Sequence, residues 1–189
     1  MEKEQIQMET YISILRGINV GGQKKIRMAD LKTLYERLKF KEITTYIQSG
    51  NVIFNTDKSL PRQEISKRIE EKITEKYNFI VPVIIRTKSE MVKTFSDNPF
   101  LDRKDINPER LHVTFLAGLP KQADKKRIEK LEFPPDEFII DGKEIYLHCP
   151  NGYGKTKLSN NFFENRLNVT ATTRNWRTIS ILVALAANK

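Results

Sequence analysis

The 189-residue sequence contains very little cysteine and histidine, and this excludes several kinds of site. Its single cysteine, Cys149, cannot form a disulfide within the chain, and one cysteine with two histidines cannot build an ordinary structural zinc site. The chain also lacks a run of about 18 apolar residues, the length that crosses a membrane as a helix. These shortages favour a cytoplasmic protein with no metal, no cofactor and no membrane partner.

The first ten residues lack the basic and then apolar pattern of a secretory signal. They are polar and acidic, so we expect residues 1–10 to form a short disordered leader. The rest of the chain has the composition of a globular protein and is long enough to bury a core.

Positive charge is unevenly distributed along the chain, whose formal net charge is +9. Residues 14–41 contain eight Lys or Arg against two acids, and residues 151–189 contain six against Glu164 alone. Because these two segments hold more than the whole net charge, the basicity is local. Either two solvated helix faces or a surface for an anionic partner would explain it.

The hydrophobic pattern predicts two halves of the same design. Each half has the order βαββαβ, which is typical of a ferredoxin-like unit, an antiparallel sheet with helices on one face. The predicted elements of the first half are residues 11–16, 28–38, 44–47, 52–54, 61–78 and 81–86, followed by an added helix at 89–96. Those of the second half are residues 111–116, 120–131, 138–140, 145–149, 158–167 and 169–173, followed by an added helix at 176–187. The sequence therefore predicts an α+β fold of two ferredoxin-like subdomains in tandem, residues 11–98 and 108–189, joined by a polar link that contains prolines.

Five stretches of the chain resemble a known family. They read LRGINVGGQKKIRMADL, TYIQSGNVIF, NPFLDRKDINPERLHVTFL, GYGKTKLSNNFFENRL and ATTRNW. They are similar to the motifs of the bacterial family catalogued as domain of unknown function 1697, over about residues 11–185. The resemblance implies the same two ferredoxin-like subdomains. Because the family has no established reaction, it implies no activity and no catalytic residues.

Two of these stretches contain a glycine loop, at residues 17–22 and 152–157. Each loop lies between a predicted strand and a predicted helix in one of the basic segments. Such loops can present backbone N–H groups to a phosphate beside a helix terminus. Neither completes a known motif: Gly154, Lys155 and Thr156 end the pattern G-x-x-x-x-G-K-[ST], but Cys149 occupies its first glycine position. Glycines needed only for tight turns are the alternative. The residues predicted to bind an anionic ligand are Arg16, Asn19, Gly21, Gly22, Lys25, Gln48, Asn51, Tyr153, Gly154, Lys155, Thr156, Lys157, Arg174 and Asn175.

The expected topology also assigns these motifs to sheet edges. If the first and third strands of each half run parallel, residues 17–22 and 152–157 lie at one edge of their own half. Residues 48–51 and 174–176 then lie at the opposite edge. The four motifs would converge only if unlike edges of the two halves met.

No complete catalytic constellation is present in the sequence. Cys149 alternates in phase with Leu147, which indicates an inert position on the core face. His112 and His148 are out of phase with their apolar neighbours, so we expect them to share the outer sheet face on adjacent strands, about 5 Å apart. They are either ordinary polar residues of that face or a pair for proton transfer. The single tryptophan, Trp176, begins an apolar helix and is expected to pack in a core.

Three classes of function stay open. The local basicity favours a binder of an anionic partner, RNA or single-stranded DNA, with Tyr153 stacking on a base. The alternatives are an enzyme acting on a small phosphorylated or nucleotide-like substrate, and a protein-interaction scaffold. A deep pocket lined by Arg16, Lys155 and Arg174 would favour the enzyme, and a shallow basic strip would favour nucleic acid. The sequence does not decide the oligomeric state.

Overall fold

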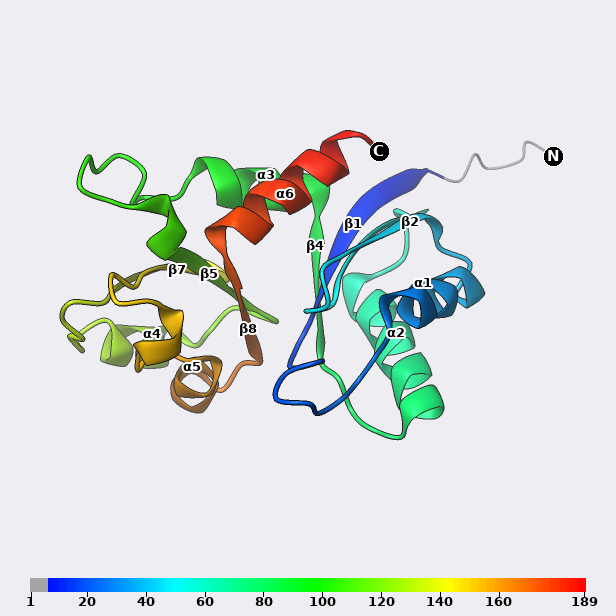
Figure 1. Cartoon of the computed structure of the whole chain (residues 1–189), viewed down its shortest axis with the longest axis horizontal. Helices are drawn as coiled ribbons and strands as arrows, with labels where there is room; N and C mark the ends of the chain where they lie inside the picture. The colour runs from blue at the N-terminus through cyan, green and yellow to red at the C-terminus, as the bar shows by residue number, and fades with distance from the viewer. Residues whose placement is uncertain (1–6) are drawn as a thin grey trace. The chain divides into compact units, whose positions relative to one another are not determined.

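The computed structural model describes residues 7–189 and has an α+β architecture with two four-stranded antiparallel sheets (Figure 1). This confirms the two ferredoxin-like subdomains that the order of elements predicts. The chain divides into two compact units. One unit runs to Met91 and includes Leu182–Lys189, and the other is Val92–Ile181.

The division between the units lies earlier in the chain than the expected link at residues 98–108. It falls within helix α3 (Lys88–Ser96). The expected link belongs to the second unit because Phe100 is buried and its ring centroid lies 5.9 Å from that of His148. The end of the chain belongs to the first unit, where Lys88 Nζ donates to the carbonyl oxygen of Lys189 at 3.2 Å.

The first unit is built on a sheet with the strand order β2-β3-β1-β4, in which every pairing is antiparallel. Its strands and helices are β1 (Met8–Leu15), α1 (Met28–Arg37), β2 (Lys41–Tyr46), β3 (Asn51–Asp57), α2 (Arg62–Tyr77) and β4 (Val83–Thr87). The expected leader is therefore too long, because Met8 already pairs with Asp57 and residues 8–10 belong to the sheet. Residues 1–6 of that leader lie outside the described residues.

Helices α1 and α2 close the core of the first unit against its sheet. Ile65, Ile69 and Ile73 recur every fourth residue and form one buried stripe along α2. Full burial of such a side chain contributes about 1.5–3 kcal/mol. The hydroxyl of Tyr35 on α1 lies 2.7 Å from Oγ of Ser13 on β1, so the polar end of this buried ring is also satisfied.

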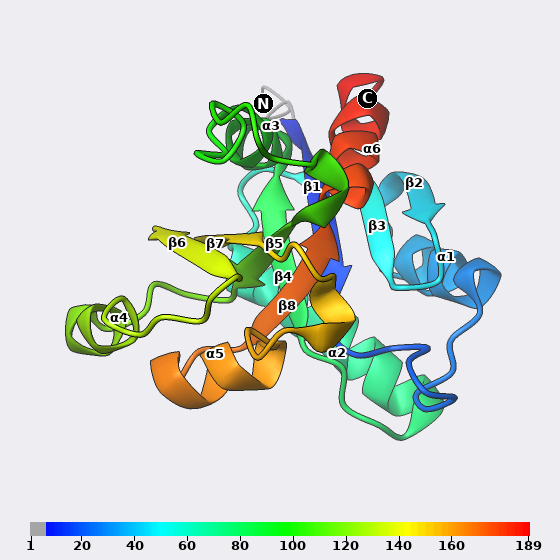
Figure 2. The same cartoon turned by 60° about the vertical axis from the view of Figure 1, so that its left-hand side comes forward.

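The second unit repeats this layout with the strand order β6-β7-β5-β8 (Figure 2). Cys149 lies in its core, as its phase predicts, and burial raises the pKa of the thiol to about 11. Trp176 is also buried, and its ring stacks on Phe95 with the centroids 4.9 Å apart. The elements of this part of the chain are η1 (Pro108–Arg110), β5 (Leu111–Leu116), α4 (Gln122–Ile128), β6 (Glu137–Asp141), β7 (Glu144–His148), η2 (Tyr153–Lys155), α5 (Asn160–Leu167), β8 (Ala171–Asn175) and α6 (Trp176–Ala187).

The expected assignment of motifs to sheet edges is wrong. The first strand of each unit runs antiparallel to its central neighbour, since β1 pairs with β3 and β5 with β7 in that sense. The loop after β1 therefore meets the β2–β3 turn, where Asn19 Nδ2 donates to the Gln48 carbonyl at 2.7 Å. In the second unit, the start of β5 pairs with the ends of both β7 and β8. Each pair of motifs thus converges within its own unit.

The expected placement of the two histidines is also wrong. His112 pairs with Leu147, a residue of the helix-covered core, whereas His148 pairs with Leu111. Directly paired residues share a face, so the two imidazoles lie on opposite faces of the sheet. The prediction failed because every residue of β5 is buried, and alternation of apolar residues therefore does not identify the core side.

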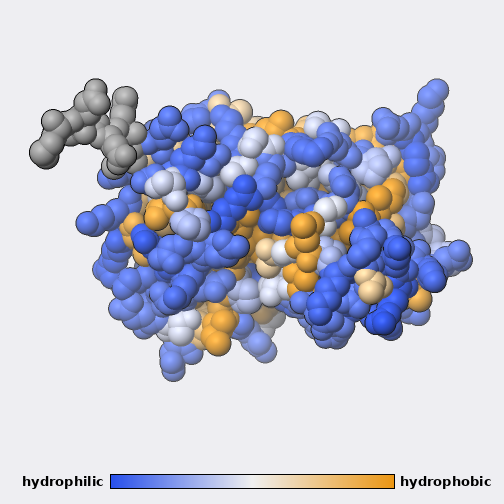
Figure 3. Space-filling model, turned by 180° about the vertical axis from the view of Figure 1, so that it is seen from behind, coloured by the Kyte–Doolittle hydropathy of each residue, from blue (hydrophilic) through white to orange (hydrophobic). Residues whose placement is uncertain are grey.

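Hydrophilic side chains cover most of the face that Figure 3 shows, and hydrophobic residues reach the surface there in separate small areas. The most exposed large apolar side chains of the described chain are Val20, Ile80 and Leu119. Among residues 7–189, none of the helices combines the length and the apolar character that a bilayer crossing requires.

Candidate anion-binding site

The loop between β1 and α1 is shaped by residues with positive φ angles. Gly21 and Gly22 have φ angles of 58° and 76°, and Asn19 has a φ angle of 55°. Asn19 holds the loop closed, because its Oδ1 accepts from the backbone N–H of Ile26 and its Nδ2 donates to the Ile26 carbonyl, both at 2.9 Å. Its third bond, from Nδ2 to the Gln48 carbonyl, fixes the loop to the β2–β3 turn.

Helix α1 begins at the end of this loop with a terminus that favours anions. Arg27 occupies the N-cap position and, within the described residues, makes no side-chain hydrogen bond to the first turn. The N–H groups of a first helical turn have no partner in the helix itself, and the helix dipole adds partial positive charge there. Lys25 and Arg27 are exposed beside the terminus. The only acid of the first turn, Asp30, lies 3.6 Å from Lys76 Nζ.

A cleft of about 640 Å³ opens at this terminus, and we call it the α1 cleft. Tyr77, the last residue of α2, is part of its wall, and its ring stacks on Phe79 with a centroid distance of 5.6 Å. The Tyr77 hydroxyl oxygen is buried and has no hydrogen-bond partner among residues 7–189. A buried hydroxyl in this state is uncommon, because such groups are nearly always paired. The lining residues are Asn19, Gly22, Lys25, Ile26, Arg27, Met28, Asp30, Gln48 and Tyr77.

The turn beside the cleft uses two of the motif residues for structure. Gly50 has a φ angle of 77°, and a Cβ atom added there would lie 2.6 Å from Cδ1 of Ile18. Asn51 is buried, and its Nδ2 donates to the Tyr46 carbonyl at 3.2 Å and to Oγ of Ser49 at 3.0 Å. Asn51 therefore closes the turn that carries Gln48.

The corresponding loop of the second unit is held by its own core. Tyr153 stacks on His112 with a centroid distance of 4.9 Å, and its hydroxyl donates to Oγ1 of Thr173 at 3.0 Å. Burial lowers the pKa of the His112 imidazole, which favours the neutral form of this stacked ring. Oγ1 of Thr156 accepts from the backbone N–H of Leu158. The exposed residues of the predicted ligand-binding set in this loop are Gly154, Lys155 and Lys157.

The two motif residues at the end of β8 also have structural partners. Arg174 is 8% exposed, and its Nη1 donates to Oγ1 of Thr172 and to the Thr173 carbonyl at 3.0 and 2.9 Å. Burial lowers the pKa of this guanidinium to about 10. Oδ1 of Asn175 accepts from the backbone N–H of Thr178 at 2.8 Å, so Asn175 caps helix α6.

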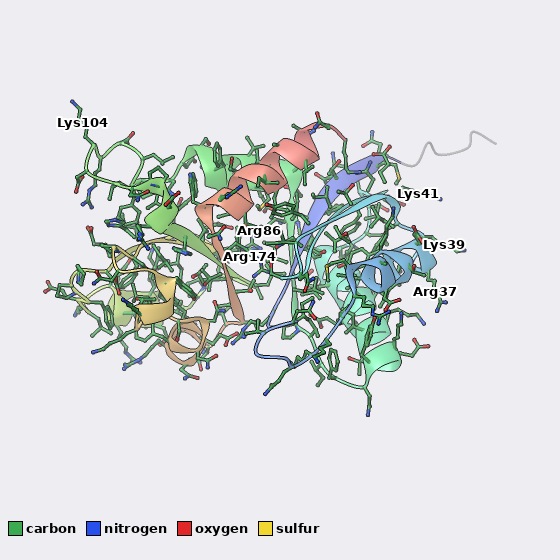
Figure 4. The ribbon with its side chains drawn as sticks, viewed as in Figure 1. Arg37, Lys39, Lys41, Arg86, Lys104 and Arg174 are labelled. Carbon is green, nitrogen blue, oxygen red and sulfur yellow. The ribbon has the colours of Figure 1, made fainter. Side chains whose placement is uncertain are left out.

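Most cations of the basic segment at residues 14–41 lie near the two ends of α1, and the exposed Lys32 lies between them on the helix. Lys25 and Arg27 flank the start of α1, whereas Arg37, Lys39 and Lys41 surround its end (Figure 4). A helix of ten residues is about 15 Å long, so the groups stand apart by roughly that distance. The remaining cation of the predicted set, Arg16, donates its backbone N–H to the Pro82 carbonyl.

The α1 cleft combines predicted and unpredicted residues. Asn19, Gly22, Lys25 and Gln48 belong to the predicted ligand-binding set, and the structure brings them together. Tyr77 was missed because it lies far away in the sequence, at the end of another helix. Among the described residues, no three His, Cys, Asp or Glu side chains gather as a metal ligand set would.

Comparison with known proteins places the chain by fold and family. The solved structure of the conserved bacterial protein SP0830 from Streptococcus pneumoniae is similar, with a TM-score of 0.75 and 23% sequence identity, over 95% of this chain and 99% of that one. At this identity the similarity shows the fold alone. No curated protein matches the chain. The family described as Protein of unknown function (DUF1697) matches residues 8–146, and the chain belongs to that family.

Proposed function

We propose that the protein binds a small phosphate-bearing ligand in the α1 cleft. The observation that carries this proposal is Tyr77, a residue of the cleft wall beside Lys25 and Arg27, whose buried hydroxyl has no hydrogen-bond partner among the described residues. A bound phosphate oxygen would give this hydroxyl an acceptor once the ring turns to expose it to the cleft. The proposal makes the protein a binder of small anions and leaves open whether a reaction follows.

The groups that line the cleft match the chemistry of a phosphate monoester. Its oxygens accept hydrogen bonds, and the α1 terminus, the Lys25 ammonium and the Arg27 guanidinium all donate them. Hydrogen bonds to charged groups contribute about 1.5–3 kcal/mol each. At about 2 kcal/mol each, two such bonds correspond to a Kd of roughly 1 mM and three to a Kd of roughly 0.04 mM.

A small ligand fits the described residues better than a nucleic-acid strand does. The cleft volume of about 640 Å³ lies within the range of small-molecule sites, about 300–1,000 Å³. Tyr153, the residue expected to stack on a base, has one ring face against His112 and its hydroxyl bonded to Thr173. Most cations around α1 lie near the two ends of the helix, and a single exposed cation, Lys32, lies between them.

Removal of the cleft cations tests the proposal directly. Inorganic phosphate and a nucleoside monophosphate would be titrated into the full chain and followed by two-dimensional amide NMR. We expect the double variant Lys25→Ala, Arg27→Ala to bind at least 10-fold more weakly. The matched control Arg37→Ala, Lys39→Ala removes the same charge from the other end of α1 and should bind nearly as the wild type does. Equal losses in both variants, or no binding to the wild type, would overturn the proposal.

The variant Tyr77→Phe tests whether the unpaired Tyr77 hydroxyl contributes to ligand binding. We expect phosphate affinity to fall about 5-fold, the cost of roughly one neutral hydrogen bond. The free protein should be as stable as the wild type or more stable by about 1 kcal/mol, because the change removes an unpaired buried hydroxyl. A clear loss of thermal stability would show that the hydroxyl has a structural partner and does not bind the ligand.

Binding to a strand of RNA separates the proposal from the nucleic-acid alternative. The exposed group at the end of α1, Arg37, Lys39 and Lys41, is the feature that favours this alternative. A strand that contacts both groups would lose affinity steeply with salt, with a log–log slope of about −0.7 per phosphate neutralised. In fluorescence anisotropy with a single-stranded oligonucleotide, equal reductions of that slope by the two double variants would favour nucleic acid.

A further inference from the structure

A groove of about 710 Å³ runs beside strand β6 in the second unit, and we call it the β6 groove. Strand β6 is at one edge of its sheet, and among the described residues it pairs with β7 alone (Figure 2). The chain segment just before β6 contributes the rest of the lining. The lining residues are Glu129, Leu131, Glu132, Phe133, Pro134, Pro135, Asp136, Glu137, Phe138, Ile139 and Ile140.

The free edge of β6 offers backbone hydrogen bonds to an added strand. Alternate residues of an edge strand direct their N–H and C=O groups away from the neighbouring strand. An extended peptide can pair with such an edge, and side-chain pockets beside the strand then select its sequence. Ile139 is 42% exposed, and the half-buried rings of Phe133 and Phe138 line the same groove. The groove therefore offers apolar contacts next to an open edge.

Charge gives the groove a preference for one kind of partner. Its described lining contains four carboxylates and no Lys, Arg or His, although the whole chain has a net charge of +9. Glu137 is paired with Arg103 at 2.8 Å, and Glu129 lies 3.6 Å from Lys125. No ion pair joins Glu132 or Asp136 to a cation of residues 7–189. These two side chains leave net negative charge in the groove.

We infer that the β6 groove binds an extended peptide that carries lysine or arginine, added to the sheet beside β6. Pairing of β6 with its own copy is disfavoured, because an antiparallel β6–β6 register places Glu137 opposite Asp141, and like charges directly opposite each other destabilise a strand pair. A strand that carries Lys or Arg would instead place positive charge opposite these carboxylates on the same edge. This inference concerns the second unit and is independent of the α1 cleft.

A designed peptide tests the inference. The probe is a fluorescent six-residue peptide of alternating lysine and valine, and its control replaces each lysine with glutamate. We expect the lysine peptide to bind the full chain and the glutamate peptide not to bind. Methylation of alternate backbone nitrogens, which removes strand pairing but keeps the charge, should weaken binding at least 10-fold.

Variants of the protein identify the site of binding. The double variant Glu132→Gln, Asp136→Asn should bind the lysine peptide about 5- to 10-fold more weakly. The matched control Glu71→Gln, Glu75→Gln neutralises two exposed carboxylates on α2 and should bind as the wild type does. Equal effects of the two variants, or equal binding of the methylated peptide, would show non-specific charge attraction and overturn the inference. So would dimerisation of the free protein that blocks binding of the lysine peptide, because a second copy would then occupy the groove.

Discussion

Glycine at position 50 is required by packing as well as by backbone conformation, whereas glycine at position 21 is required by conformation alone. Both residues have positive φ angles, 77° and 58°. An added Cβ atom at Gly50 would lie 2.6 Å from Cδ1 of Ile18 and 2.8 Å from Cβ of Leu15. At Gly21 no described atom beyond the adjacent residues of the chain lies within 4 Å of the same position. The two residues therefore form a matched pair within neighbouring loops.

We expect Gly50→Ala to destabilise the protein by about 3 kcal/mol, which combines left-handed backbone strain with overpacking. Gly21→Ala should cost only the strain, about 1 kcal/mol. Urea unfolding followed by circular dichroism measures both values. If the two variants lost the same stability, the contact between the β2–β3 turn and Ile18 would not be tight.

The residues of the candidate site show what a sequence can and cannot reveal. The glycine loop and its cations were predictable, because glycines and lysines that precede an amphipathic helix are typical of a loop that receives an anion. The amides were harder to interpret. Asn51 and Asn175 were predicted to bind a ligand, yet their side chains close a turn and cap a helix. The same hydrogen-bonding groups serve both purposes, and only the three-dimensional partners distinguish them.

At the scale of elements, the start of α6 depends on Asn175. The residue lies just before Trp176, and its Oδ1 accepts the backbone N–H of Thr178. We expect Asn175→Ala to destabilise the protein by about 1 kcal/mol, the usual cost of losing an N-cap. Asn175→Asp keeps the acceptor and should be nearly neutral. Thermal unfolding of the two variants checks this, and equal losses would argue against a capping role.

The order of helices and strands was predictable from the sequence. The relative direction of the strands, and the side of the sheet on which each residue lies, were predicted only in part. Alternation of short apolar runs with amphipathic helices is enough to give βαββαβ twice. The crossover helix makes the second strand parallel to the first, so the third strand, joined to the second by a hairpin, must run antiparallel to the first. The β2–β3 turn therefore lies at the same edge as the end of β1 and not at the opposite edge. The predicted face of the β5 side chains was wrong, because both sides of that strand are buried.

At the scale of the whole molecule, net charge is a poor guide to the local surface. The first unit has cations at both ends of α1, whereas the β6 groove of the second unit is acidic. A value of +9 therefore conceals local regions of opposite sign. Long-range attraction of an anionic partner follows the total charge, but binding follows the local arrangement of groups.

Acid should destabilise the molecule, because several carboxylates ionise more readily in the folded chain than in the unfolded one. A hydrogen bond from Arg68 lowers the pKa of Glu64. Arg103 lowers the pKa values of Asp105 and Glu137 in the same way. A carboxylate with a lowered pKa stabilises the fold above its unfolded pKa, about 4, and this contribution is lost as pH falls through the folded pKa. We expect the melting temperature to fall below about pH 4.5.

The variant Arg103→Ala identifies one source of this dependence. Glu137 accepts from Nη1 of Arg103 through both carboxylate oxygens, at 3.0 and 2.8 Å. Without the guanidinium the pKa of Glu137 should rise toward its ordinary value, so the variant should melt below the wild type at pH 7. The difference should shrink by pH 3, where the carboxylate becomes protonated in both proteins.

The control for this measurement is Lys104→Ala, which removes the next cation along the chain, shown projecting from the same loop in Figure 4. It should melt with the same pH dependence as the wild type. Arg103 also lies over the Phe100 ring, 5.9 Å from its centroid, and this contact does not depend on pH. A deficit of equal size at pH 7 and pH 3 in Arg103→Ala would therefore assign the role of Arg103 to packing against Phe100, with no contribution from its carboxylate partners.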